Sequence, residues 1–572
     1  MNIQPAITLG SRETSPQPLN PILVDYLANI KKYFRVALAF SFFTNLLVLT
    51  VPLYMLQVYD RVLASRSMDT LFLLTLIAVV SLLALSLLDS SRAHLVARFG
   101  YRLDQKLSPA VIKAILGTAL VKSRFPSVKG MRDLATIRNL LNSTAATALL
   151  DIPWMPIFFL VIFLLHPALG WLAVIGCVVL LGVAWLGESS NREALEVAGQ
   201  KGQLLLQHVE SGARSADAFE AMGISQRWID RWMQGNISLL QQNANINDRN
   251  SLVLAISRFF RMGLQVAVLC VGAYLVLEGE ITPGVMIAAA ILISRALTPV
   301  EQSIGSFKSL IAAKMSFTDL SNLLHQVPDA NKSLPLPKPK GQLDVENMTY
   351  FHPGSGEPCL SSINFSLMPG ESLGIIGPSG AGKSTLSRLL VGTLIPRLGH
   401  VRLDGMDIAQ WESTDRGQYI GYLPQNVDLV AGSVVENISR MNSGEHEKVI
   451  EAAKLAGAHE FIMRLPKGYD TDIGDQGLAL SSGQRQRIGL ARALYGDVSY
   501  VLLDEPNAHL DHDGEQELIK SLKRLSEAGI TVIIVAHRPL VIQQVDKLLV
   551  LKNGRIADFG PRGKIMQSVV PV

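Results

Sequence analysis

Six apolar runs, each close to the length that crosses a bilayer as a helix, lie before about residue 305 and constrain this chain's fold more than any other feature. The 572-residue chain is 49% hydrophobic and only 17% charged, which is unusual for a soluble protein. The first run is longer than the apolar part of a signal peptide and leads into a second span, so we interpret it as a helix. The runs cover approximately residues 36–58, 70–88, 149–165, 168–186, 256–277 and 284–303. We therefore predict a multidomain membrane protein with an all-α, six-helix transmembrane domain.

The spacing of these runs predicts the topology. Runs three and four, and runs five and six, are separated only by short turns, whereas residues 89–148 and 187–252 form long helical segments with a polar face. The two long segments carry ten and six Lys/Arg residues, against only Arg61 and Arg66 in the short loops. By the positive-inside rule both long segments are cytoplasmic, and six spans then place both termini in the cytoplasm.

The composition changes after the sixth span. Proline recurs at positions 328, 335, 337 and 339, which is typical of an extended linker. Beyond it, β-rich runs alternate with helical stretches, which predicts an α/β domain with a largely parallel sheet. These runs are Ser372–Ile376, Val401–Leu403, Tyr500–Leu503 and Thr531–Val535. The predicted order is a cytoplasmic tail (1–30), the membrane domain (31–326), the linker (327–340) and the α/β domain (341–572).

A glycine-rich segment between an apolar strand and a helix has the pattern of a P-loop. Its glycines let backbone N–H groups surround phosphates, Lys383 reaches the β and γ oxygens, and the Ser384 hydroxyl can bind magnesium. The predicted nucleotide-binding residues here are Gly377, Pro378, Ser379, Gly380, Ala381, Gly382, Lys383, Ser384 and Thr385.

Two acidic residues follow a second apolar strand. Asp504 ends this strand and is expected to lie near the metal, together with Ser384. Glu505 is then expected beside the γ-phosphate, where a carboxylate can polarise the attacking water. ATP and Mg²⁺ are the ligands that this combination predicts.

Just before this strand, the sequence Leu-Ser-Ser-Gly-Gln at 480–484 resembles the signature motif of ATP-binding cassette proteins. Ser482 departs from the family, which usually has glycine there. The motif opens a helix, whose N-terminus can face the γ-phosphate held by another cassette, so the resemblance implies a dimer. It also implies that Ser481, Ser482, Gly483 and Gln484 bind nucleotide.

The remaining cassette motifs follow in the family's order. Gln425 resembles the Q-loop glutamine, which contacts the metal and the water, and His537 resembles the switch histidine, so both are expected to act in catalysis with Glu505. Asp511 resembles the D-loop aspartate. His352 stands where the family stacks an aromatic ring on adenine, with Tyr350 and Phe351 as possible substitutes.

Six spans before one cassette resemble the type IV exporter architecture. Residues 52–62 (PLYMLQVYDRV) and 504–511 (DEPNAHLD) further resemble type I secretion ATPases of the PrtD protease-exporter kind. This resemblance implies a homodimeric half-transporter of the bacterial inner membrane that exports unfolded polypeptides with a C-terminal signal. It also implies a periplasmic adaptor and an outer-membrane channel as partners.

Two other functions remain open on the sequence. One is a lipid or drug exporter of the same architecture. The other is a nucleotide-gated channel or a non-transporting ATPase regulator, which Glu505 and His537 argue against. The net charge of +4 is spread along the chain, so nucleic acid is not an expected partner. Within the spans, Asp151, Arg258 and Arg261 are interpreted as anchors near the interface, and Arg295 as a pathway candidate.

Overall fold

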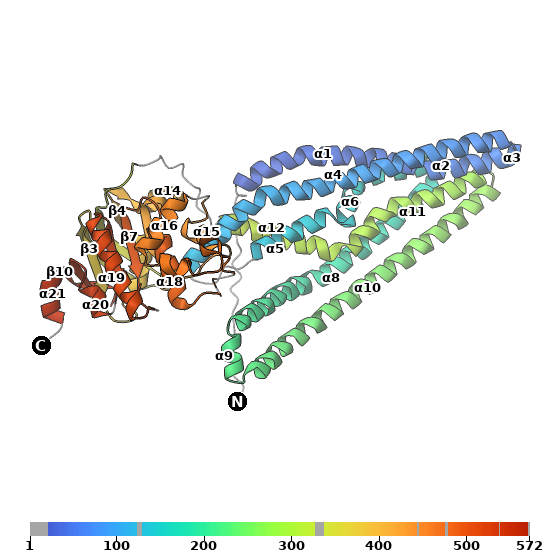
Figure 1. The fold of residues 1–572 in the computed structure, drawn as a ribbon. Helices are drawn as coiled ribbons and strands as arrows, with labels where there is room; N and C mark the ends of the chain where they lie inside the picture. The colour runs from blue at the N-terminus through green and yellow to red at the C-terminus, as the bar shows by residue number, and fades with distance from the viewer. Residues whose placement is uncertain are drawn as a thin grey trace, which may run out of the picture. The chain divides into compact units, whose positions relative to one another are not determined.

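The computed structural model describes two compact units, one helical and one α/β (Figure 1). The described residues are 21–122, 129–325, 337–442, 445–474, 477, 479–508, 510–536 and 538–569. Residues 1–20 of the predicted tail, most of the predicted linker and His537 lie outside them. Each unit is described by itself below.

The helical unit contains six helices, or helix groups, that are long and apolar enough to cross a membrane, as predicted. Three of them continue far beyond their apolar parts without a break, because α4 has 55 residues, α8 has 48 and α10 has 53. At 1.5 Å per residue such helices are roughly 70–80 Å long. The unit's helices are α1 (Pro21–Val48), α2 (Thr50–Gln57), α3 (Leu63–Ser65), α4 (Met68–Lys122), α5 (Lys129–Leu141), α6 (Thr144–Asp151), α7 (Met155–Leu165), α8 (Pro167–Arg214), α9 (Ala216–Ala221), α10 (Ser225–Leu277), α11 (Pro283–Gly305) and α12 (Phe307–His325).

The sixth span is the most buried of the six. Within its most apolar window, α11 has 56% of its residues buried, whereas the corresponding window of α4 has none. Small residues on α11 allow close approach of α2, α7, α8 and α10, as is usual in membrane helix packing. The large apolar side chains of α4, such as Phe72 and Leu87, are 70% exposed and are suited to contact with lipid.

The first span contains a short π-helix (Val58–Val62), which is hydrogen-bonded to the start of α11. The Asp60 carboxylate accepts hydrogen bonds from the Thr282 hydroxyl (2.5 Å) and from the Gly284 backbone N–H (3.0 Å). A Cβ at Gly284 would lie 2.4 Å from the Asp60 carboxylate, so only glycine permits this approach. The sequence run at 52–62 that resembles secretion ATPases therefore contains a cap for the sixth span.

Two of the charged residues singled out in the spans, Asp151 and Arg261, have charged partners inside the unit. Arg92, only 5% exposed, donates to the Asp151 carboxylate at 2.5 Å. The same carboxylate accepts a hydrogen bond from Asn45 (2.7 Å) and contacts the Ser41 hydroxyl, so α1, α4 and α6 meet at one polar cluster. Asp151 is thus a half-buried partner shared by three helices. Arg261 pairs with Glu301 at 3.0 Å, and Arg295 is exposed.

The α/β unit contains two sheets within its described residues. One has the order β10-β9-β3-β8-β7-β6, in which β9, β3, β8, β7 and β6 run parallel, and the other is antiparallel with the order β2-β1-β4-β5. Three of the four predicted strand runs lie in the parallel sheet. Residues 401–403 belong to the antiparallel sheet. The strands are β1 (Leu343–Phe351), β2 (Pro358–Leu367), β3 (Ser372–Ile376), β4 (Leu398–Leu403), β5 (Met406–Asp407), β6 (Ile420–Leu423), β7 (Tyr500–Asp504), β8 (Thr531–Val535), β9 (Lys547–Lys552) and β10 (Arg555–Pro561).

The parallel sheet is buried on both faces. Along β7, Val501 and Leu503 pack into one apolar cluster, whereas Tyr500 and Leu502 pack into another. Because successive side chains of a strand point to opposite faces, a strand covered on both sides reads as a continuous apolar run. The unit's helices are α13 (Lys383–Leu390), α14 (Ser413–Tyr419), α15 (Val434–Ile438), α16 (His446–Leu455), α17 (His459–Ile462), α18 (Ser482–Leu494), α19 (His512–Glu527), α20 (Pro539–Ile542) and α21 (Arg562–Val569).

Candidate nucleotide site

One edge of the parallel sheet brings the predicted motifs together. The adjacent strands β3, β8, β7 and β6 are all parallel, so their carboxyl ends lie at the same edge. The P-loop follows β3, Asp504 ends β7, and Gln425 comes two residues after β6. His537 follows β8 by two positions but lies outside the described residues. Ligands of open α/β sheets bind at this edge, outside the strand carboxyl ends.

The P-loop backbone requires its glycines. Gly380 and Gly382 have φ of +80° and +101°, in the region that other residues rarely adopt. At Gly377 an added Cβ would come within 2.2 Å of the Leu551 carbonyl oxygen, and at Gly382 within 2.8 Å of Leu360. The loop is therefore a fixed backbone turn that leads into the N-terminus of α13, where N–H groups and the helix dipole favour a phosphate.

Lys383 is held inside this turn. Its amine donates to the carbonyl oxygens of Gly377 (2.8 Å) and Pro378 (3.0 Å), and the residue is only 8% exposed. Burial lowers the pKa of the Lys383 amine, while the neighbouring carboxylates of Glu505 and Asp504 oppose that change. The ammonium group is thus positioned beside the two acids before any phosphate enters.

Asp504 has the environment of a metal ligand. It is 2% exposed, and its Oδ1 has no hydrogen-bond partner among the described residues. Burial, followed by the charge of Glu505, raises the pKa of this carboxyl from 3.8 to about 6, although Lys383, Arg388 and a hydrogen bond with Ser384 act in the opposite direction. A buried oxygen without a partner next to a serine hydroxyl fits a Mg²⁺ ion, which prefers carboxylate and hydroxyl oxygens.

Glu505 lies in a strained but well-supported backbone conformation. Its φ of +50° is uncommon for a residue with a side chain, and its N–H donates to the Val535 carbonyl of β8 at 2.9 Å. The Gln425 amide donates to the Glu505 carboxylate at 3.0 Å. The structure therefore places two of the three predicted catalytic residues in direct contact.

Gln486 supports the same turn and was not among the predicted site residues. This side chain of α18 is 2% exposed and donates to the carbonyl oxygens of Glu505 (3.3 Å) and Pro506 (3.1 Å). In the sequence, Gln486 is simply one residue of the helix that follows the signature motif. A polar residue at a helix position that is buried was the feature that could have indicated its role.

A row of hydrogen-bonded polar side chains lies just beyond Asp504 and Glu505 in the sequence. Asn507 is buried and donates to the Glu515 carboxylate (3.2 Å), which also pairs with Arg538 (3.0 Å). These hydrogen bonds, first that of Asn507, lower the pKa of Glu515. Arg538 directly follows His537 in the chain, so this contact fixes one neighbour of the predicted switch histidine.

The signature motif forms the N-terminus of α18. The Ser481 hydroxyl accepts from the Gln484 N–H (3.2 Å), and the Gln484 side chain accepts from the Ser481 N–H (2.9 Å), which makes a capping box. Ser482 is the first residue of the helix, is exposed, and is not among the residues with positive φ. A side chain is therefore compatible with the backbone at this position, where the family usually has glycine.

The D-loop aspartate and the three rings predicted near adenine differ in how accessible they are. The Asp511 carboxylate caps α19 by accepting from the Gly514 N–H at 2.9 Å, so in this chain it is occupied locally. Tyr350 is buried, and Phe351 is covered by Arg397 at 5.1 Å from its ring centre. His352 is exposed and meets Tyr350 edge to face, so of the three rings it is the one accessible to a base.

Fold and site together define a membrane domain joined to a P-loop ATPase domain. The ABC transporter transmembrane region matches residues 34–300, and the ABC transporter family matches residues 360–508. The structure also resembles that of a bacterial Atm1-family ABC exporter with ATP bound, with a TM-score of 0.81 over 95% of this chain and 97% of the other, at 21% identity. This structural similarity shows the fold and nothing about the function.

Sequence relatives specify the family further. The chain is 39% identical to the type I secretion system ATP-binding protein PrsD of Rhizobium meliloti (strain 1021), over 93% of this chain and 91% of that protein. It is 29% identical to the toxin RTX-I translocation ATP-binding protein of Actinobacillus pleuropneumoniae, over 96% and 77%. The leukotoxin translocation ATP-binding protein LktB of Mannheimia haemolytica is also 29% identical, over 96% and 78%. The chain belongs to the type I secretion ABC transporters, which are membrane-spanning ATPases whose ATP hydrolysis drives export.

Proposed function

We propose that this chain works as a homodimeric half-transporter that exports an unfolded polypeptide across the bacterial inner membrane, driven by hydrolysis of Mg·ATP. The observation that carries the proposal is the match to a type I secretion ATP-binding protein over nearly the whole of both chains. The relatives named for toxin translocation add support for a polypeptide cargo. A periplasmic adaptor and an outer-membrane channel complete the path, and the cargo carries a C-terminal signal.

The residues at the sheet edge suggest how ATP is hydrolysed. The P-loop N–H groups and Lys383 bind the β- and γ-phosphates, and Ser384, Asp504 and Gln425 hold Mg²⁺. When bound, Mg²⁺ neutralises phosphate charge and favours the ionised form of Asp504. Glu505, oriented by Gln425, polarises the attacking water, and His537 contacts the γ-phosphate from the end of β8.

Two cassettes are needed because the signature motif completes the site of the partner. Ser481 and Ser482 are exposed at the N-terminus of α18, where the helix dipole favours a γ-phosphate. In the proposed dimer, ATP closes the cassettes head to tail, with Gly483, Gln484 and Asp511 in the same interface. Hydrolysis then resets them, and the long helices α4, α8 and α10 carry the change into the spans.

The topology expected from the sequence is compatible with the proposed export. The basic segments 89–148 and 187–252 and both termini face the cytoplasm, where ATP is available. The helices that extend beyond the spans are then all cytoplasmic, and cargo enters from that side.

A lipid or drug exporter of the same architecture is the second candidate. A cavity of about 430 Å³ between α1, α4, α5, α6 and α12 favours it, because its lining is almost entirely apolar, with Ala37, Phe99 and Leu107 among the residues. Such a cavity suits an acyl chain or an amphiphilic drug better than a hydrated peptide.

The experiment that separates the two candidates measures ATPase activity of the purified full-length protein in lipid nanodiscs. A polypeptide ending in a secretion signal should increase hydrolysis, whereas amphiphiles alone should not. A response confined to amphiphiles would favour the lipid or drug exporter. In either case Glu505→Gln should bind ATP and lose turnover, and unchanged hydrolysis in that variant would refute the catalytic assignment.

A further inference from the structure

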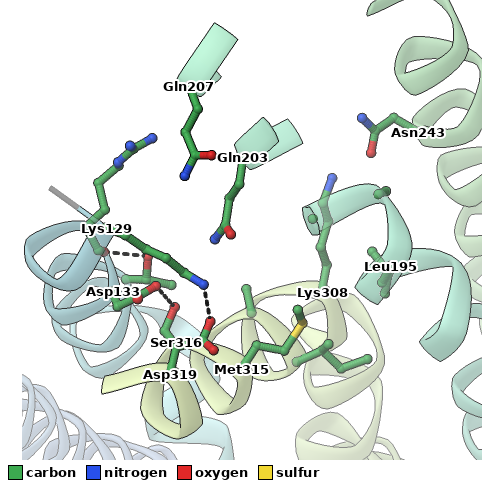
Figure 2. Close-up of a pocket in the computed structure, with 16 residues that line it drawn as sticks. Lys129, Asp133, Leu195, Gln203, Gln207, Asn243, Lys308, Met315, Ser316 and Asp319 are labelled. Carbon is green, nitrogen blue, oxygen red and sulfur yellow. Dashed lines mark hydrogen bonds and ion pairs between the residues drawn. The ribbon is translucent and has the colours of Figure 1, made fainter. Parts of the chain in front are cut away.

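A cavity of about 290 Å³, lined by both polar and apolar side chains, lies within the helical unit. It is enclosed by α5 and α12 on one side and by α8 and α10 on the other (Figure 2). Gln203 lies seventeen positions beyond the predicted end of the fourth span at residue 186, which corresponds to roughly 25 Å along a helix. The cavity is therefore outside the apolar part of the spans, on the side of the long basic segments.

The wall formed by α5 and α12 is held by two internal contacts. The Ser316 hydroxyl donates to the buried Asp133 carboxylate at 3.0 Å, and the Lys129 amine pairs with Asp319 at 2.7 Å (Figure 2). Both acids on the lining are thus already used within this wall. Lys129 balances the charge of Asp319, and with Arg132 and Lys308 the lining has one more basic than acidic side chain.

The remaining polar groups face the open space. The carboxamides of Gln203 and Gln207 on α8 and of Asn243 on α10, and the amine of Lys308 on α12, point into it (Figure 2). None of these four groups has a protein hydrogen bond or ion pair within the described part of the chain. Each carboxamide offers two donors and one acceptor, the same groups that pair with a peptide backbone.

The base of the cavity is apolar. Leu195, Ala198 and Ile311 line it and are each less than 10% exposed, and Met315 lies beside them. Carboxamides at the sides, an uncompensated ammonium and an apolar base match an extended polypeptide with a carboxylate side chain. A lipid tail would leave the carboxamides unpaired, which is unfavourable.

One exposed ion pair crosses between the two walls. Arg132 on α5 lies 3.8 Å from Glu210 on α8, and both side chains are about half exposed. Exposed pairs of this kind contribute only about 0–1 kcal/mol. This ion pair between α5 and α8 can therefore open at little cost.

We propose that this cavity receives an extended, acidic segment of the exported polypeptide before the segment enters the spans, with Lys308 binding its carboxylate. The inference rests on the proposed polypeptide export. It assigns the first contact of the cargo to Lys308, Gln203 and Asn243 of the helical unit.

Binding of a defined probe tests the assignment. The probe is a fluorescein-labelled twelve-residue peptide of alternating Glu and Ala, compared with the matching Gln/Ala peptide, on the full-length protein in nanodiscs. Lys308→Gln should weaken binding of the Glu peptide by about fivefold, which is the change in affinity expected from the loss of one partly exposed charge pair. It should not affect binding of the Gln peptide. Lys308→Arg should restore binding.

Lys314→Gln is the matched control, because Lys314 is an exposed lysine of the same helix that does not line this cavity. It should bind the Glu peptide like the wild type, and both variants should keep basal ATPase activity. Equal weakening by the two variants, or no weakening by Lys308→Gln, would overturn the proposal.

Crosslinking in cells separates this proposal from the proposed function. A photo-reactive amino acid at Asn243 should crosslink to exported polypeptide, and Lys308→Gln should reduce that product. If polypeptide export depends on Glu505 but no crosslink forms at Asn243, only the cavity assignment fails. If no polypeptide in the medium depends on Glu505, the proposed function itself fails.

Discussion

At the residue scale, Asp504 and Glu505 are neighbours in sequence but differ in environment. Asp504 is enclosed at the end of a buried strand, and one of its carboxylate oxygens has no hydrogen-bond partner in the described part of the chain. Glu505 has a left-handed backbone conformation, and its carboxylate accepts a hydrogen bond from Gln425. One carboxylate is therefore suited to a metal and the other to a water. This division follows from the geometry of a single strand end.

Asp504→Asn should stabilise the nucleotide-free protein at neutral pH while removing ATPase activity. The folded pKa of about 6 lies above the ordinary value of 3.8, so the buried carboxyl stabilises the fold most at low pH and loses that contribution as the pH rises to about 6. The difference corresponds to at most about 3 kcal/mol at pH 7. Thermal unfolding of the full-length protein between pH 4 and 7 measures it.

The same carboxyl should make Mg-dependent ATP binding depend on pH. Only the ionised form binds the cation well, so affinity should rise up to about tenfold per pH unit below 6 and level off above about 7. Asp504→Asn should bind ATP weakly and with little change over this range. An equal slope in both proteins would show that another group causes it.

Gln486→Ala should reduce turnover by about tenfold or more and leave ATP affinity within about twofold, because it frees the backbone that positions Glu505. Single-turnover hydrolysis and nucleotide titration measure the two effects separately. Gln543→Ala, at an exposed glutamine of the same unit, should change neither. Loss of affinity in Gln486→Ala would indicate a folding defect instead of a positioning role.

At the scale of the element, α18 depends on its N-terminal cap. Ser481→Ala removes one half of the capping box and should lower the free energy of unfolding by about 1 kcal/mol, together with ATPase activity. Ser482→Gly should change stability by less than about 1 kcal/mol, because the residue is exposed at the first helical position. Thermal unfolding and ATPase assays distinguish the two variants, and a larger effect of Ser482→Gly would contradict the assignment of the cap.

The cap of α11 provides a second prediction at this scale. Asp60→Ala removes two hydrogen bonds to a charged acceptor and should destabilise the full-length protein by about 1–3 kcal/mol. Asp69→Ala, at an exposed acid of the first turn of α4, should cost about 0.3–1 kcal/mol. Equal melting temperatures for Asp60→Ala and the wild type in nanodiscs would rule out the cap as a stabilising contact.

The sequence was most informative for features that depend on a single helix or strand. Apolar runs predicted the six spans, and strand ends predicted the positions of the P-loop, Asp504 and Gln425. Contacts between distant segments could not be predicted, because neither residue indicates its partner: Asp60 meets Thr282, and Gln486 meets Glu505. The antiparallel sheet that contains residues 401–403 was not foreseen as a separate sheet, because a short apolar run does not reveal the direction of its neighbour.

At the scale of the whole molecule, the chain combines a membrane-spanning helical unit with a cassette, and in the proposed dimer a second copy completes the nucleotide site. The proposed dimer explains why the signature helix exposes its N-terminus while the P-loop is preformed elsewhere in the same unit. In the proposed cycle, ATP binding closes the two cassettes and hydrolysis opens them again. The proposal assigns the transfer of this movement to the helices that extend beyond the spans.

The central claim is that Glu505-dependent ATP hydrolysis exports a polypeptide. Its most direct test is quantitative proteomics of the culture medium from cells that carry the wild-type chain or Glu505→Gln at equal membrane levels. The account predicts that one or a few polypeptides present with the wild type disappear from the medium with the variant and accumulate inside the cell. Identical media from the two strains would contradict it.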